Sequence, residues 1–224
     1  MTDPVPVITI DGPSGSGKGT VTQLVARRLG WRVLDSGALY RLVGLATSKS
    51  GVGFENQNKI SDIANKLNVE FNGEKILLDG EDVTDVIRTE AAGNDASRVA
   101  AMSAVRATLL DWQRQYARAP GLVADGRDMG TTVFPAAKVK IFLTASAQER
   151  AKRRHKQLKE KGLPANLAAL TAEIEERDAR DRGRAASPLV PAPDAIEIDS
   201  TGMDIDRVVE IVLRQAHAAY ATPL

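Results

Sequence analysis

The stretch that decides the fold is ITIDGPSGSGKGT, residues 8–20. It begins as an apolar, β-branched run, passes through a loop with four glycines in eight positions, and leads into helical spacing of apolar residues. The usual phosphate-loop pattern, G-x-x-x-x-G-K-[ST], is met at Gly12, Gly17 and Lys18. Gly19 stands where that pattern needs a hydroxyl, and the threonine comes one place later. The stretch therefore predicts a phosphate loop of a variant kind.

A glycine-rich turn between a buried strand and a helix can bind phosphate for a physical reason. Successive backbone N–H groups are aimed at one point, and the helix N-terminus adds its positive end. Lys18 adds a mobile cation for the β- and γ-phosphates. An ordinary glycine-rich turn is the alternative, but the lysine, the glycine spacing and the strand–helix context agree on a phosphate loop. The predicted nucleotide-binding residues are Gly12, Pro13, Ser14, Gly15, Ser16, Gly17, Lys18, Gly19 and Thr20.

Short apolar runs alternate with helical patterns over most of the chain. After Lys18, apolar residues recur at helical spacing as far as Gly30, a typical helix end. Further helices are predicted over residues 38–46 and 204–220. Strand, loop, helix and strand make the unit that a parallel α/β sheet repeats. Five buried strands are predicted, at residues 5–11, 31–37, 121–126, 139–145 and 195–199.

Residues 67–88 depart from this rhythm. The dipeptides Asn72-Gly73 and Asp79-Gly80 tolerate positive φ and stand between short β-rich segments, so each predicts a hairpin turn. Three short antiparallel strands, forming a small inserted lobe, are the expected result.

Two long helical patterns flank the third and fourth predicted strands of the sheet. One runs from about residue 89 to 119, and Pro120-Gly121 ends it. The other is a charged region over residues 147–184, which the segment KGLPAN, residues 161–166, interrupts. We expect this break to act as a hinge.

The composition excludes several classes of protein. The chain has 224 residues with 30 Lys and Arg against 29 Asp and Glu, a net charge of +1 that suggests no general nucleic-acid or polybasic membrane surface. It has no cysteine, which excludes disulfides and thiolate metal sites, and its two histidines make a zinc site improbable. No secretory signal and no apolar run long enough to span a membrane is recognisable. A cytoplasmic protein is the expectation, and the low aromatic content (4%) favours a monomer.

The phosphate loop resembles that of nucleoside monophosphate kinases, in which glycine follows the lysine and threonine stands next. Four further stretches resemble the cytidylate kinases, the family of CMP and dCMP kinases. The similarity covers almost the whole chain and includes the inserted lobe, which distinguishes this family from the adenylate kinases. These stretches are LDSGALYR (34–41), IRTE (87–90), ADGRDMGTTVFP (124–135) and ERDARDRGR (176–184).

The resemblance implies an α/β fold with a P-loop NTPase-type core, a parallel five-stranded sheet flanked by helices. It also implies an inserted lobe that binds the nucleoside monophosphate (NMP) and contains the small antiparallel sheet, and a helical lid. The expected division of this single kinase chain is a core of about 1–58, 99–148 and 186–224, an NMP-binding lobe of about 59–98, and a lid of about 149–185.

Arg41, Arg127 and Arg184 match the family's positions for the acceptor phosphate. Arginine suits this role because its fork binds phosphate oxygens in pairs. The alternative for the run at 176–184 is a set of surface ion pairs at helical spacing. The resemblance favours the functional interpretation.

Asp128 matches the family's base-reading aspartate, which accepts from the N4 amino group of cytosine and would repel the O4 of uracil. Arg106 and Ser97 would donate to N3 and O2. Arg106 has a solvated helix face as its alternative, and Ser97 a turn or cap. The resemblance further implies contacts to the nucleotide from Ser36, Arg177 and Asp181.

Thr20 and Asp125 are the candidate magnesium ligands, directly or through water. Asp125 ends a predicted strand beside the phosphate loop, where a carboxylate could hold the water shell of Mg²⁺. A turn or helix-capping aspartate is the alternative.

The basic segment 149–162 resembles the lid of these kinases. Its arginines are candidates to stabilise charge on the transferred phosphoryl group, namely Arg150, Arg153 and Arg154, with Arg150 and Arg154 placed among the catalytic residues beside Lys18, Arg127 and Arg184. Its lysines Lys156, Lys159 and Lys161 are expected on a solvated face. No aromatic residues interleave with these charges, which argues against nucleic acid as a partner.

The function that follows is transfer of the γ-phosphoryl group from ATP, with Mg²⁺, to CMP or dCMP. CMP or dCMP is expected between the core and the inserted lobe. Three alternatives remain open: a kinase for another small acceptor such as AMP, UMP or shikimate, a nucleotide-dependent switch, and an RNA-binding module that uses the basic lid. A switch of the guanine-reading kind is disfavoured because no N-K-x-D motif is present.

Overall fold

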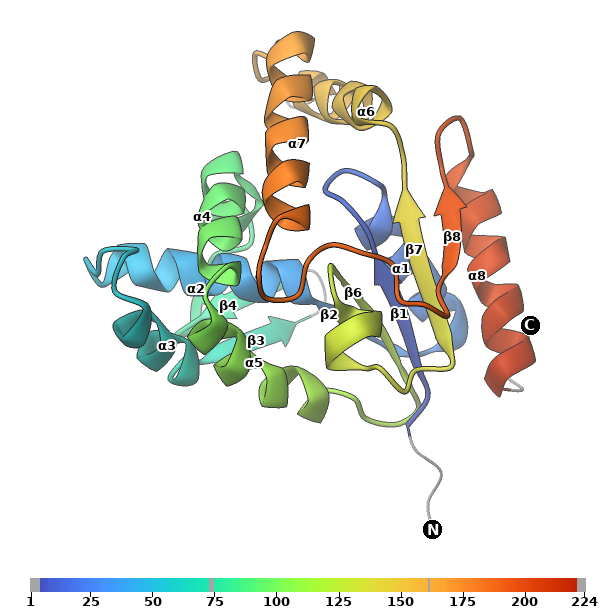
Figure 1. Cartoon of the computed structure of the whole chain (residues 1–224), viewed down its shortest axis with the longest axis horizontal. Helices are drawn as coiled ribbons and strands as arrows, with labels where there is room; N and C mark the ends of the chain where they lie inside the picture. Colours follow the sequence, from blue (N-terminus) through green and yellow to red (C-terminus); the bar gives the residue numbers. More distant parts are fainter. Residues whose placement is uncertain (1–4, 73–74, 161, 221–224) are drawn as a thin grey trace. The chain divides into compact units, whose positions relative to one another are not determined.

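The computed structural model of the protein describes residues 5–72, 75–160 and 162–220 (Figure 1). The chain divides into two compact units. The core unit consists of Met1–Leu34 and Tyr116–Leu224, and the inserted unit of Asp35–Gln115. The inserted unit contains the predicted lobe 59–98 and extends beyond it on both sides, while the predicted boundaries of core, lobe and lid stay predictions.

A five-stranded sheet forms the centre of the core unit (Figure 1). Its order is β2-β6-β1-β7-β8, and β1 pairs in parallel with both β6 and β7, as β7 does with β8. The predicted α/β fold with a five-stranded parallel sheet is therefore confirmed. The strands are β1 (Val7–Asp11), β2 (Arg32–Asp35), β6 (Leu122–Gly126), β7 (Val139–Thr144) and β8 (Ile196–Asp199).

The central strands are apolar because helices cover them. Ile8 and Ile10 of β1 are fully buried, in one cluster with residues of α1 (Lys18–Leu29) and α8 (Ile205–Tyr220). α8 is held at its end by Tyr220, whose hydroxyl donates to the Val7 carbonyl at 2.6 Å. Polar side chains lie at the carboxyl ends of the strands, such as Asp11 of β1 and Asp125 of β6.

Two helices follow β7, as the broken charged pattern predicts. α6 (Ala147–Glu160) and α7 (Leu167–Arg182) pack against each other in the core unit. The Asn166 side chain caps α7 by accepting from the Ala169 N–H at 3.0 Å. Lys156 and Lys159 are exposed as expected, and Lys161 lies outside the described residues.

The inserted unit is built mainly from helices around two apolar clusters. α2 and α4 approach closely at Gly44. A Cβ added at this glycine would lie only 2.9 Å from the Cβ of Asp95 on α4. The elements are α2 (Ser36–Lys49), α3 (Gln57–Asn65), β3 (Val69–Asn72), β4 (Lys75–Leu78), β5 (Glu81–Asp82), the short turn η1 (Val86–Arg88), α4 (Glu90–Ala100) and α5 (Ser103–Gln115).

The predicted antiparallel sheet is confirmed, with β4 between β3 and β5. Asp79 and Gly80 have φ values of 52° and 82°, the left-handed conformation that the sequence signal requires. Of the other predicted turn, Asn72-Gly73, the second residue lies outside the described residues.

The helical pattern predicted over residues 89–119 is present, but it is divided by a turn. The pattern over residues 89–119 forms two helices, because the chain turns at Ala101 and Met102, whose N–H groups bond to carbonyls only three residues back. The turn lets Val99 of α4 and Val105 of α5 reach the same buried cluster. Within the described part of the chain, no helix is long and apolar enough to cross a membrane.

Candidate active site

The loop between β1 and α1 has the conformation of an anion site. Gly12 has a φ of 151°, and a Cβ there would lie 2.0 Å from the carbonyl oxygen of Leu143. Gly17 precedes the helix with a φ of 98°, and no side chain caps the first turn. The N–H groups at the start of α1 are thus left for a ligand.

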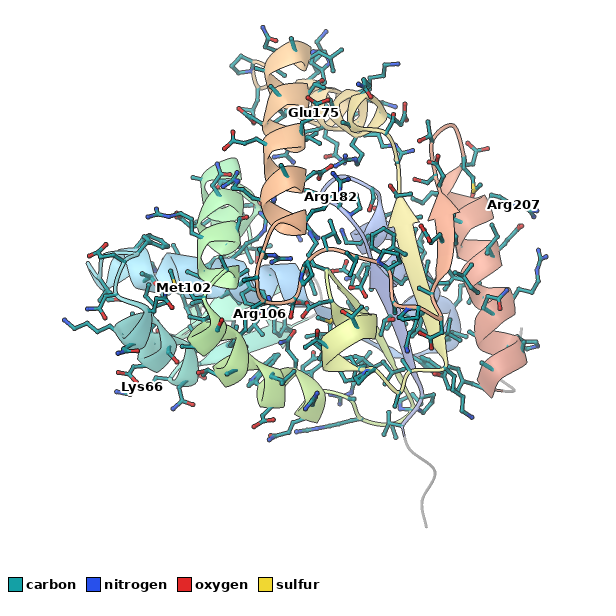
Figure 2. All side chains as sticks on the ribbon, viewed as in Figure 1. Lys66, Met102, Arg106, Glu175, Arg182 and Arg207 are labelled. Carbon is teal, nitrogen blue, oxygen red and sulfur yellow. The ribbon has the colours of Figure 1, made fainter. Side chains whose placement is uncertain are left out.

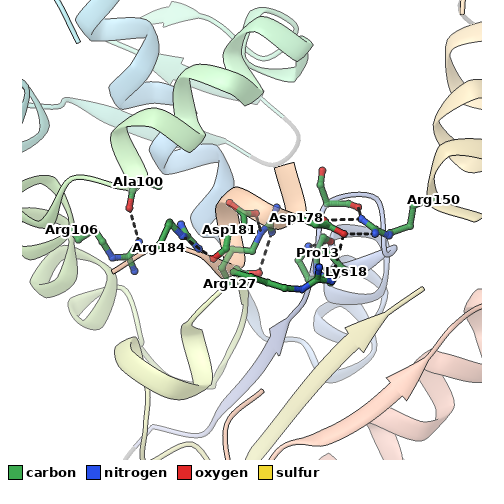
Figure 3. A network of polar contacts seen from close by, with 12 residues as sticks. Pro13, Lys18, Ala100, Arg106, Arg127, Arg150, Asp178, Asp181 and Arg184 are labelled. Carbon is green, nitrogen blue, oxygen red and sulfur yellow. Dashed lines mark hydrogen bonds and ion pairs between the residues drawn. The ribbon is translucent and has the colours of Figure 1, made fainter. Parts of the chain in front are cut away.

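Three cationic side chains hold the carbonyl oxygens of this loop. Lys18 Nζ donates to the Pro13 carbonyl at 2.9 Å, and Arg150 Nη1 to that of Ser14 at 2.9 Å (Figure 3). Arg153 Nη1 donates to the Ser16 carbonyl at 3.3 Å. These three hydrogen bonds link the loop to α6 and to the first residue of α1.

Lys18 is buried, with only 7% of its surface exposed. Burial, followed by repulsion from Arg127, lowers the pKa of Lys18 from 10.5 to about 7, although the Asp125 carboxylate opposes this. Burial disfavours the charged form of Lys18, and a bound anion would raise the pKa of this lysine again. The site therefore favours an anionic ligand.

Residues directly after β6, on α7 and after α7 meet around the carboxylate of Asp181 (Figure 3). Arg127 Nε donates to Asp181 Oδ2 at 2.8 Å, and Arg184 Nε donates to the Asp181 carbonyl at 3.3 Å. Burial raises the pKa of Asp181, but Arg127, Arg184 and Arg177 together bring the pKa below its usual value. The core unit therefore gathers four predicted nucleotide ligands in one place.

The charged run at 176–184 divides into two faces. Asp178 and Asp181 are buried, and Arg177 and Arg184 are half-buried. The other members of the run are exposed, among them Arg182, which Figure 2 labels beside the lower part of α7. The exposed face of α7 carries an ion pair at helical spacing, that of Arg180 with Glu176, whereas the nucleotide-binding role of the buried and half-buried residues stays a prediction.

Asp125 is buried at the carboxyl end of β6, beside the loop. A Cβ added at Gly19 would lie 3.5 Å from Asp125 Oδ2, while Thr20 is exposed. One carboxylate and one hydroxyl fit the way Mg²⁺ is held, with nucleotide phosphates and water as the remaining ligands. In the described parts of the chain, no cluster of three acidic or histidine side chains could hold a metal ion alone.

The arginines of α6 differ in what they contact. Arg150 donates to both carboxylate oxygens of Asp178, and its Nε donates to the Ala145 carbonyl at 2.9 Å. Arg153 donates to the hydroxyl and, at 2.7 Å, to the carbonyl of Ser200 after β8. Arg154 lies half-buried on the same helix.

Asp128 is buried and directly precedes the short π-helical turn η2 (Met129–Val133). Beneath this turn lies Asp11, whose carboxylate accepts from the N–H groups of Met129 and Gly130, both at 2.8 Å. Burial raises the pKa of Asp11 to about 6, against the effect of these two hydrogen bonds.

The remaining predicted ligands belong to the inserted unit, each on a helix. Ser36 is buried at the start of α2, where Asp35 caps the helix. Arg41 Nη1 donates to the Ile87 carbonyl at 2.6 Å. Arg106 Nη1 donates to the Ala100 carbonyl at 3.3 Å, and Ser97 is half-buried on α4.

Sequence reasoning missed Asp11, Asp178 and Ser200. For Asp11 a signal existed: a carboxylate ends a strand whose five residues are all buried, and a buried carboxylate needs partners. For Asp178 and Ser200 the signal is absent, because their partners are distant in the sequence.

Comparisons with known proteins relate the whole chain to one family. The sequence model of the family described as cytidylate kinase matches residues 8–218. A cytidylate kinase of Pseudomonas aeruginosa is 57% identical over 220 residues, covering 96% of this chain and of that protein. One of Stutzerimonas stutzeri is 56% identical over 221 residues, with the same coverage. Among solved structures, an uncharacterized protein from Eubacterium ventriosum has a TM-score of 0.51 at 13% identity, covering 96% of this chain and 99% of that one, a likeness of fold alone.

Proposed function

The chain belongs to the cytidylate kinase family, and from this premise we propose that it transfers the γ-phosphoryl group of ATP to CMP or dCMP, assisted by Mg²⁺. The observation that carries the proposal is the gathering of cations in the core unit. Lys18 lies in a phosphate loop, and its pKa is lowered by burial and by Arg127 and Arg177. Cations forced together in this way favour a site for polyanions.

The reaction needs positioning rather than a strong base. The attacking oxygen of a nucleoside monophosphate is already anionic, so it attacks the γ-phosphorus in line without giving up a proton to the protein. No covalent intermediate on the enzyme is required. The side chains contribute by neutralising charge and by excluding water, which would otherwise compete as the acceptor.

ATP is proposed to bind to the loop from Gly12 to Thr20. The N–H groups at the start of α1 are not capped by a side chain, which supports this assignment. Lys18 would leave the Pro13 carbonyl for the phosphates. Mg²⁺ would bind between the phosphates, with Thr20 and Asp125 as the protein's contribution, directly or through water.

The acceptor phosphate is proposed to bind Arg127 and Arg184 of the core unit and Arg41 of the inserted unit. For cytosine, we assign Asp128 to N4, with Arg106 and Ser97 donating to N3 and O2. The sugar and the remaining nucleotide atoms are assigned to Ser36, Arg177 and Asp181.

Arg150 and Arg154 are proposed to stabilise charge on the transferred group. Arg150 contacts Asp178, Ala145 and Ser14, so it can reach a phosphate only by exchanging one of these contacts. Monomeric state, a cytoplasmic location and the absence of nucleic-acid partners remain part of the proposal.

The decisive experiment measures ADP formation from ATP and Mg²⁺ with CMP, dCMP, UMP, AMP, GMP or no acceptor. Strong turnover with CMP and dCMP, and little without an acceptor, is expected. Hydrolysis that does not depend on an acceptor would contradict the proposal and favour a switch. Asp128→Ala tests the base assignment, since it should impair use of CMP more than the affinity for ATP.

A further inference from the structure

The carboxylate of Asp11 has no role in the substrate assignments made above. It lies at the end of β1, 5% exposed, and Asp11 is not among the nucleotide ligands predicted from the sequence. Its Oδ1 accepts from the Met129 N–H and its Oδ2 from the Gly130 N–H, each at 2.8 Å. Both oxygens are thus used by two successive N–H groups of one turn.

This turn carries two residues of the site. Asp128 is the N-cap of this turn, and its carbonyl accepts from the N–H groups of Thr132 and Val133 at 2.9 and 3.2 Å. Arg127 directly precedes it. The position of both side chains therefore depends on where the turn lies on β1.

The turn approaches β1 closely, and Asp11 is at the point of approach. A Cβ added at Gly130 would lie 2.9 Å from Thr9 Oγ1, 3.2 Å from Lys140 Cδ and 3.4 Å from Asp11 Oδ2. Thr9 and Asp11 lie on the same face of the strand, because side chains alternate along a strand. Of these two side chains, only that of Asp11 bonds to the turn: Thr9 Oγ1 has no hydrogen-bond partner among the residues that the structure describes.

The arrangement is a costly way to fill this space. A buried carboxylate is unfavourable, whereas an apolar side chain would pack without that cost. An apolar side chain would, however, leave the N–H groups of Met129 and Gly130 without these acceptors. Two charge-assisted bonds from one rigid side chain fix the turn in both position and orientation.

We propose that Asp11 is a positioning residue that fixes the Arg127–Asp128 segment on β1 and thereby sets the affinity for the acceptor and the selectivity for cytosine. The inference rests on the proposed function, because it assigns Asp11 to the same reaction. It adds a residue that touches no substrate and acts through the backbone of residues 128–130.

The test compares Asp11→Asn with Thr9→Val. Asparagine has nearly the same shape as aspartate, but one of the two carboxylate oxygens is replaced by an NH₂ group. This donor would face one of the backbone N–H groups of Met129 and Gly130. We expect the KM for CMP to rise by about tenfold or more, and the preference for CMP over UMP in kcat/KM to fall by a similar factor. The KM for ATP should change by less than about threefold, since the phosphate loop keeps its carbonyl contacts and Asp11 has the smallest effect among the charges that shift the pKa of Lys18. Thr9→Val removes the neighbouring hydroxyl, which has no partner among the described residues, and should leave all of these constants unchanged.

A purely structural role predicts a different pattern. In that case Asp11→Asn lowers the melting temperature and the amount of active enzyme, while the KM for CMP and the CMP to UMP preference stay as in the wild type; this result would overturn the inference. If the asparagine variant does not fold, Gly130→Ala decides the matter. Its new methyl group pushes the same turn away from β1, so the KM for CMP should rise as in Asp11→Asn. Failure of the proposed function would be visible in the wild-type protein itself, as absent turnover of CMP.

Discussion

Two ionisable side chains of the phosphate-loop segment are held in the fold against their preference for water. Burial raises the pKa of Asp11 from 3.8 to about 6, so its contribution to stability is largest below about pH 3.8 and is lost as the pH rises through about 6. Burial and Arg127 lower the pKa of Lys18 from 10.5 to about 7, so the folded state loses this proton first and stability increases with pH between about 7 and 10.5. Near neutral pH both groups therefore reduce stability, as expected for groups retained for function.

Replacing Lys18 should separate activity from stability. Lys18→Met should lower kcat by at least about 100-fold, because the cation that neutralises the transferred phosphoryl group is lost. The melting temperature at about pH 6 should stay the same or rise, since a buried charge has been removed. Steady-state kinetics and thermal unfolding measure both, and Lys152→Met, at an exposed position on α6, is the control. Near-wild-type turnover in Lys18→Met would remove the phosphate-loop assignment.

Binding of ATP should be linked to uptake of a proton. At about pH 8 a lysine with a pKa of about 7 is mostly neutral, and the phosphates of bound ATP raise that pKa again. Calorimetric titrations in buffers of different ionisation enthalpy should show uptake approaching about one proton. The uptake should be absent in Lys18→Met. Equal binding enthalpies in all buffers for the wild-type protein would contradict the lowered pKa.

At the scale of elements, one buried ion pair joins α6 and α7. Arg150 and Asp178 are 2% and 3% exposed, and the carboxylate accepts from two nitrogens of the guanidinium. The same guanidinium reaches the phosphate loop at Ser14. Arg150 therefore connects the helix pair to the loop, beside Arg153 of α6, which reaches the loop at Ser16. Loss of the ion pair leaves a charge buried without its partner.

Breaking this pair should cost far more than breaking an exposed one on the same helix. Asp178→Ala should lower the free energy of unfolding by about 3–5 kcal/mol, because the Arg150 guanidinium stays buried. The matched control is Glu176→Ala, which removes the exposed pair with Arg180 and should change stability by less than about 1 kcal/mol. Urea unfolding measures both variants. Similar losses for the two would show that the pair is effectively solvated.

At the scale of the whole molecule, each unit has its own apolar core. In the core unit, strand and helix residues such as Ile10 and Val212 form one buried cluster. In the inserted unit, Ile60, Val99 and Val105 belong to another. Separate cores allow the two units to open in separate steps.

A cavity in the inserted unit should reveal this division. Ile60→Ala removes a fully buried side chain and should cost the inserted unit about 2–5 kcal/mol. Native-state amide exchange should then accelerate within Asp35–Gln115 while the amides of β1, β6 and β7 keep most of their protection. Equal acceleration in both units would show that they unfold as one.

Local patterns in the sequence determined the elements and the class of the site. The glycine loop, the apolar strands, the Asp79-Gly80 turn and the break at residues 161–166 each depend on residues close in the chain, so their signals can be recognised without a structure. The family's motifs likewise identified the acceptor. Within the helical pattern predicted over 89–119, local spacing does not mark the turn at Ala101 and Met102, which brings two apolar faces to one cluster.

The tertiary structure alone decided what depends on distant parts of the chain. It set the strand order β2-β6-β1-β7-β8, and it brought Asp11 to N–H groups 118 and 119 residues away. It also paired Arg127 with Asp181, 54 residues apart. Such pairs leave no periodic pattern in the sequence, because a buried charge selects its partner by proximity in the folded core. The sequence thus determined which residues carry the charges, and the packing of the sheet decided which charges neutralise one another and which remain for a ligand.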